Sequence, residues 1–106
     1  MPDVLSSKQI KYQAPSEDLP YILKLSTWVS SISGTPTILK VVDVEAPDTD
    51  ISGTHIASGT VTVSGTDITL PRLKSLVLGV VYRVHVNFST DGINKYEANF
   101  RVECRY

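Results

Sequence analysis

Few side chains in this sequence are of the types that carry out chemistry. The two histidines, His55 and His85, are far apart, and Cys104 is the single cysteine. No cluster of His, Cys, Asp and Glu has the spacing of a zinc or iron site, and no serine stands in a Gly-x-Ser-x-Gly nucleophile elbow. We therefore expect a protein that is not an enzyme, with no catalytic residue, no cofactor and no metal.

One acidic cluster, formed by Asp43, Glu45, Asp48 and Asp50, offers oxygen ligands of the kind that calcium prefers. Calcium takes six to eight oxygens, however, and these residues lack the spacing of an EF-hand. We therefore expect a solvated loop at this point of the chain.

Three arginines near the C-terminus form the remaining candidate site. Arg83, Arg101 and Arg105 occupy alternate positions in two apolar–polar repeats, and alternate residues of a β-strand lie on the same face. They would share the outer face of a sheet, where Lys95 adds positive charge and two glutamates interrupt it. This mixture of signs argues against nucleic-acid binding. The face is either an ordinary wet sheet surface or a partner-docking face.

The elements that position these arginines form a β-hairpin. Apolar and polar residues alternate from Tyr82 to Phe88 and again from Tyr96 to Tyr106, which predicts two strands that each bury one face. Between them lies Asp91-Gly92, a dipeptide with the backbone freedom that a hairpin turn requires. Cys104 belongs to the buried set, where a thiol behaves as a small hydrophobe.

The rest of the chain predicts an all-β fold. β-branched residues dominate, no segment has the 3.6-residue period of a substantial helix, and proline or glycine marks breaks near residues 14–16, 33–36 and 46–48. About seven short strands at roughly ten-residue intervals indicate an immunoglobulin-like antiparallel β-sandwich. We expect one domain at residues 14–106. Residues 1–13 would be an N-terminal arm or first edge strand that docks on a neighbour.

Two aromatic residues are predicted to stabilise this sandwich. Tyr82 stands where an irregular apolar run becomes strict alternation, which is the position of a tyrosine corner. The ring of such a tyrosine packs inward, and its hydroxyl binds upstream backbone. Trp28, near the end of an early strand, would be the large core residue that shares the sandwich with it.

Composition and charge narrow the class of protein. The chain has 106 residues, 42% apolar and 20% charged, which suits one folded domain. A net charge of −1 argues against a protein that grips nucleic acid or an anionic membrane. Residues 1–71 carry a net charge of −4, and residues 72–106 carry a net charge of +3. This asymmetry is either incidental or a guide for head-to-tail contact between subunits. A single cysteine and no N-terminal apolar stretch predict synthesis in a reducing cytoplasm.

The segment Leu76-x-x-Gly79-x-x-Tyr82-x-Val84-x-Val86 resembles the turn-and-strand signature of fibronectin type III and related immunoglobulin-like domains. Over residues 68–104 the chain is similar to the small single-domain immunoglobulin-like proteins encoded among the virion genes of tailed bacteriophages. Leu70, Leu76, Gly79 and Tyr82 carry that likeness, together with the Ser-Thr-Asp-Gly hairpin and the regular last strand. In this signature Gly79 and Tyr82 are structural residues.

The resemblance implies a non-enzymatic structural role in a virion, as capsid decoration or as another head, neck or tail component. The partners would be other virion proteins, in a homo-oligomer or lattice, with no nucleic acid and no membrane, after synthesis in the bacterial host cytoplasm. The alternative is a stand-alone adhesion module that binds a carbohydrate or cell-surface protein through loops such as residues 48–53. Exposed aromatic rings would favour that alternative, whereas Trp28 and most tyrosines are expected to be buried.

Overall fold

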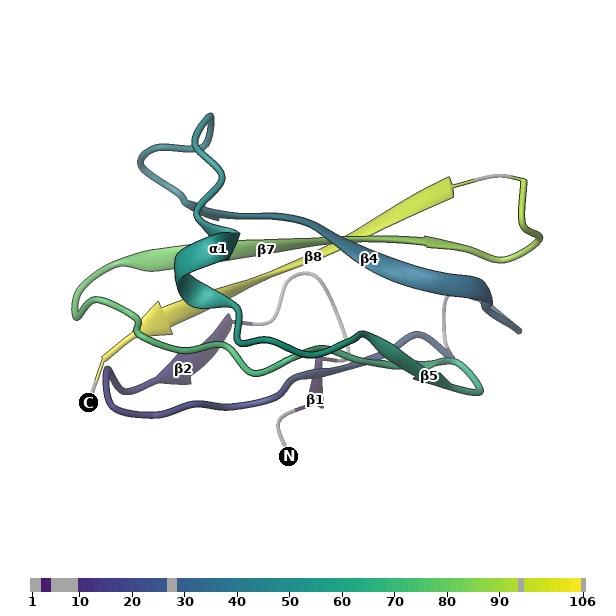
Figure 1. Ribbon diagram of the computed structural model, residues 1–106, viewed down its shortest axis with the longest axis horizontal. Coiled ribbons are helices and arrows are strands. Elements are labelled where there is room, and N and C mark those ends of the chain that lie inside the picture. The colour runs from purple at the N-terminus through teal and green to yellow at the C-terminus, as the bar shows by residue number, and fades with distance from the viewer. Residues whose placement is uncertain (1–2, 5–9, 27–28, 94, 106) are drawn as a thin grey trace.

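The computed structural model describes residues 3–4, 10–26, 29–93 and 95–105, and its strands form two sheets that pack face to face (Figure 1). One sheet, called the short sheet here, has the order β1-β3-β6-β5. The other, the long sheet, has the order β2-β8-β7-β4. The strands of the short sheet are β1 (Asp3–Val4), β3 (Ile22–Lys24), β6 (Asp67–Thr69) and β5 (Thr62–Ser64). Those of the long sheet are β2 (Ile10–Gln13), β8 (Lys95–Cys104), β7 (Val81–Ser89) and β4 (Ser33–Asp43).

This two-sheet, mostly β architecture agrees with the predicted sandwich, but the prediction that all strands are antiparallel is wrong. β1 pairs with β3 in parallel, and β2 pairs with β8 in parallel. Parallel neighbours need a long connection, and β2 and β8 lie near opposite ends of the chain. The described residues form eight strands, whereas the sequence predicted about seven. The additional strand is β1, whose two residues are too few to show an alternating pattern.

The predicted hairpin is β7 and β8, which pair antiparallel along the whole of β7. Burial alternates through all nine residues of β7, and through β8 from Ala98 onward. Tyr96 was predicted to be buried and is 48% exposed. The reason is a difference in length: β8 has ten residues, whereas β3, β5 and β6 have three each, so the hairpin end of the long sheet lacks a full cover.

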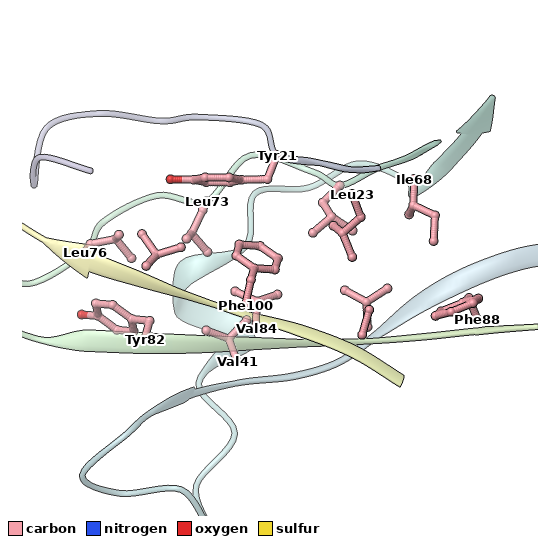
Figure 2. Close-up of a cluster of buried hydrophobic side chains, with 14 of the residues drawn as sticks. Tyr21, Leu23, Val41, Ile68, Leu73, Leu76, Tyr82, Val84, Phe88 and Phe100 are labelled. Carbon is pink, nitrogen blue, oxygen red and sulfur yellow. The ribbon is translucent and has the colours of Figure 1, made fainter. Parts of the chain in front are cut away.

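The core lies between the sheets, and Figure 2 shows how its side chains meet. Tyr21 directly precedes β3, and its ring centroid lies 5.4 Å from that of Phe100 on β8. The irregular segment between β6 and β7 adds three buried leucines, Leu70, Leu73 and Leu76. Cys104 is fully buried, and burial raises the pKa of its thiol, as suits a packing residue.

A buried polar residue that the sequence did not single out joins the two layers. Gln13 is 1% exposed at the end of β2, and its Nε2 donates to the backbone carbonyls of Leu73 at 2.7 Å and Glu17 at 2.6 Å. Its Oε1 accepts the Tyr21 hydroxyl at 2.9 Å. Because buried polar atoms are costly unless paired, these three bonds fix the edge strand β2 against the core.

The predicted break at residues 33–36 is wrong, since β4 runs from Ser33 through Pro36. β4 is an edge strand, where a proline needs no ladder hydrogen bond, and its pairing with β7 shifts register between Ser33 and Thr37. Gly34 has φ +73 within that irregularity. The one described helix, α1 (Ser52–His55), is a single turn. No helix in the described part of the chain is long and apolar enough to cross a membrane.

Candidate partner-docking face

The face of the long sheet that points away from the core carries the three predicted docking arginines. Arg83 and Arg101 each lie between two buried residues of their strands, so both point outward. They stand directly opposite each other in the β7–β8 ladder. Arg105 follows β8, and its guanidinium carbon lies 3.5 Å from the centre of the Tyr12 ring on β2. We call Arg83, Arg101 and Arg105 the arginine stripe.

None of the three arginines of this stripe forms an ion pair within the described residues, although Glu103 lies between Arg101 and Arg105 on the same side of β8. Like charges placed directly opposite each other destabilise a sheet, and here two guanidinium groups share one rung. Arg83 donates a hydrogen bond to the neutral Oδ1 of Asn99. The two ion pairs found in the described part of the chain, Lys24–Asp67 and His85–Glu97, include none of the three arginines. The stripe is therefore suited to meet carboxylates from outside.

Farther along the same face, His85 and Glu97 pair with each other. His85 Nδ1 lies 3.1 Å from Glu97 Oε2, and this hydrogen bond from the histidine holds the pKa of the Glu97 carboxyl below its usual range. Glu97 and Glu103 were both predicted to interrupt the positive face. Glu97 does so beside His85, away from the arginine stripe, whereas Glu103 lies within the stripe, between Arg101 and Arg105.

An exposed loop leaves β4 beside the arginine stripe, and all of its residues, 44–50, are exposed. Two aspartates shape its ends. Asp43 Oδ1 accepts the Glu45 N–H at 2.9 Å, and Asp50 Oδ1 accepts the N–H groups of Ser52 at 2.9 Å and Val41 at 3.2 Å. The bond from Ser52 lowers the pKa of the Asp50 carboxyl.

The other two acids of this loop are available to a partner. No hydrogen bond or ion pair within the described residues engages the carboxylates of Glu45 and Asp48. The segment is a solvated loop, as its sequence predicted, and the described residues contain no group of three or more His, Cys, Asp or Glu that could hold a metal ion. We call residues 44–50 the acidic loop.

Two of the residues predicted to be structural, Tyr82 and Gly79, lie at the end of the sandwich where β7 begins. The Tyr82 hydroxyl accepts the Val77 N–H at 2.8 Å, and its buried ring meets His55 edge-on at 4.8 Å between centroids. Burial raises the pKa of this tyrosine. Gly79 has φ +88 in the backbone turn that precedes β7. Trp28 lies outside the described residues.

A second candidate site is a cleft at the hairpin end of the sandwich. It encloses about 470 Å³ and is lined by Val29, Ser30, Phe88, Thr90, Tyr96 and Glu97. The Tyr96 ring lies 5.9 Å from that of Phe88 and is accessible. The expectation that most tyrosines are buried holds for Tyr21 and Tyr82 and is wrong for Tyr96 and Tyr12, which are about half exposed.

Neither Tyr12 nor Val44 was predicted to belong to the docking face. Tyr12 is 49% exposed and Val44 is 37% exposed, and both flank the arginine stripe. Nothing local to Tyr12 signals its contact with Arg105, because only the parallel pairing of β2 with β8 brings the two together. The exposed surface thus combines apolar side chains with unpaired charge.

No known protein family, curated protein or solved structure matches this chain.

Proposed function

We propose that this chain is an immunoglobulin-like, non-enzymatic structural protein of a bacteriophage virion, which acts through protein–protein contacts as capsid decoration or as another head, neck or tail component. In this role it works with other virion proteins, in an oligomer or lattice, and reaches the particle after synthesis in the bacterial host cytoplasm. The assignment to a virion comes from the resemblance of residues 68–104 to such proteins.

The observation that carries the docking role is the arginine stripe. Arginine is enriched at protein interfaces because its planar guanidinium binds carboxylates in a bidentate manner and stacks on aromatic rings. Here Arg105 already stacks on Tyr12, and Arg83 and Arg101 face each other with no described carboxylate paired to either. A repeated lattice multiplies contacts of this size, because each further contact forms at high effective concentration.

Two measurements test this proposal. The first is the position of the gene, which should lie among capsid, connector or tail genes; a chromosomal setting with no phage genes nearby would count against the virion role. The second is mass spectrometry of gradient-purified particles of the phage that carries the gene. The chain should be present in many copies per particle, and its absence from particles would overturn the proposal.

A matched pair of variants tests the docking face. Arg101→Glu should abolish incorporation into particles, because it reverses the charge at the centre of the stripe. Arg72→Glu is the control: Arg72 is an exposed arginine on the segment between β6 and β7, and its guanidinium binds only the Asp18 carbonyl among the described residues. Equal incorporation of both variants would show that the stripe is not the docking face.

The second candidate function is adhesion to a carbohydrate, and the cleft around Tyr96 favours it. An accessible aromatic ring beside a carboxylate is an arrangement that stacks on a sugar ring and binds its hydroxyls. The site is the hairpin end of the sandwich rather than the expected loop at residues 48–53. Binding on a glycan array that Tyr96→Ala abolishes would support adhesion. An array with no bound glycan would leave the virion role as the better proposal.

A further inference from the structure

The arginine stripe and the acidic loop lie side by side on one face of the molecule. Asp43 pairs with Tyr82 at the end of the β4–β7 ladder, and the Val44 N–H donates to the Val81 carbonyl at 3.0 Å, so the loop begins next to Arg83. Figure 1 shows the loop between β4 and α1 projecting from the long sheet on the side opposite the short sheet, and Figure 2 agrees. The loop therefore rises beside the outward face that carries the arginines.

Neither set of charges forms an ion pair within the described residues. The carboxylates of Glu45 and Asp48 form no ion pair in the described part of the chain, and neither do the three arginines. The loop is held at both ends by the carboxylates of Asp43 and Asp50. A loop that is ordered before binding loses little conformational entropy when a partner covers it.

A face that carries a negative projection next to a positive stripe is complementary to itself. In a two-fold dimer the same patch of both subunits meets, so each feature of one copy lies against a different feature of the other. Rotation of a second copy onto this face places its acidic loop over the arginine stripe of the first copy. The acidic loop of the first copy then lies over the arginine stripe of the second. The half-exposed side chains of Tyr12 and Val44 would be covered in the same contact.

We infer that the outer face of the long sheet forms a two-fold symmetric dimer, in which the acidic loop of each copy lies on the arginine stripe of the other. The partner is a second copy of this chain, chosen by charge complementarity. This inference deepens the proposed function, on which it builds, because it names a second copy of the chain as the partner that occupies the arginine stripe in the oligomer. It is tested in solution, without any particle.

Analytical ultracentrifugation of the full chain tests the dimer. At low salt we expect a species of twice the 11.6 kDa chain mass, with a dissociation constant of about 10 µM, and about tenfold weaker association at 0.5 M NaCl, where the Debye length falls to a few ångströms. A chain that is monomeric at every concentration in low salt would overturn the inference. A dimer that salt leaves unchanged would overturn it as well.

Two charge-reversed variants give a sharper test. The loop variant carries Glu45→Lys and Asp48→Lys, and the stripe variant carries Arg101→Glu and Arg105→Glu. Alone, each places like charges in both contacts, so each should be monomeric. Mixed in equal amounts, they restore opposite charges in both contacts of a 1:1 dimer. A mixture that remains monomeric would contradict the inference, and so would one that forms open chains, because a two-fold contact closes after two copies.

A control variant distinguishes the effect of where the charge is changed from the effect of the change in net charge. Glu17→Lys with Asp18→Lys changes the net charge as much as the loop variant does, but these residues lie in the exposed turn after β2. This control should dimerise like the native chain, and its dissociation would refute the role of the acidic loop. Thermal unfolding of all variants verifies that they are folded. A monomer that still enters particles would refute the dimer alone, and a dimer missing from particles would refute the virion role alone.

Discussion

Replacing Tyr82 with phenylalanine tests whether this tyrosine fastens the turn that precedes β7. In the native protein its hydroxyl accepts the Val77 N–H at 2.8 Å, while its ring is 1% exposed and packs against His55. Phenylalanine keeps the ring and its packing. The change in the free energy of unfolding therefore reports the lost hydrogen bond.

The structure sets the expected size of this change. A hydrogen bond of this kind contributes about 1 kcal/mol to stability, and a donor left buried without a partner costs up to about 3 kcal/mol. The bond is part-buried and Val77 itself is exposed, so the smaller figure applies. For a chain of 106 residues, about 1 kcal/mol corresponds to a fall in Tm of roughly 4–5 °C.

Thermal and urea unfolding followed by circular dichroism measure this change. Tyr12→Phe is the matched control, because the Tyr12 hydroxyl has no hydrogen bond within the described residues and its side chain is half exposed. The control should leave the midpoint unchanged. If Tyr82→Phe unfolds at the same midpoint as Tyr12→Phe, the stabilising role of the Tyr82 hydroxyl is refuted.

Three further changes test other parts of the structure by urea unfolding. Gly79→Ala should lower stability by about 1 kcal/mol because of its φ of +88, whereas Gly53→Ala, at a site with open space and no positive φ, should not; equal losses would contradict the strain. Gln13→Leu removes three hydrogen bonds, two of them buried, and should cost about 2–4 kcal/mol; a loss under about 1 kcal/mol would refute its role. The folded-state pKa of Asp50 lies below its ordinary 3.8, so its ionised form stabilises the fold above about pH 4 and that stability is lost as pH falls through the folded pKa. Stability of Asp50→Asn should therefore depend less on pH between about pH 5 and pH 2 than that of the native chain, and parallel pH profiles would contradict this.

The hairpin and its arginines were predictable because their signal is local. Strict alternation from Tyr82 to Phe88 and along β8 places Arg83 and Arg101 outward whatever the rest of the chain does. The tyrosine corner is local in the same way, since Tyr82 binds a residue five positions upstream. These features needed no knowledge of the sheet order.

Features that depend on distant pairing were not predictable. The contact of Tyr12 with Arg105 follows from the parallel register of β2 and β8. The exposure of Tyr96 follows from the unequal lengths of the two sheets, to which its own strand gives no clue. Pro36 was read as a break because its position on an edge strand is a property of the whole sheet. The position of the acidic loop beside the arginine stripe likewise follows from the pairing of β4 with β7.

Two tyrosines of nearly equal exposure provide the most direct test that this protein works through the outer face of the long sheet. Tyr12, at 49%, lies on that face, and Tyr96, at 48%, lies in the cleft at the hairpin end. Hydroxyl-radical footprinting of the free chain, at a concentration well below the dissociation constant of the dimer, and of the chain on purified particles measures the reactivity of both rings. We predict that Tyr12 is protected on the particle and Tyr96 is not, and protection of Tyr96 with Tyr12 unchanged would contradict this account.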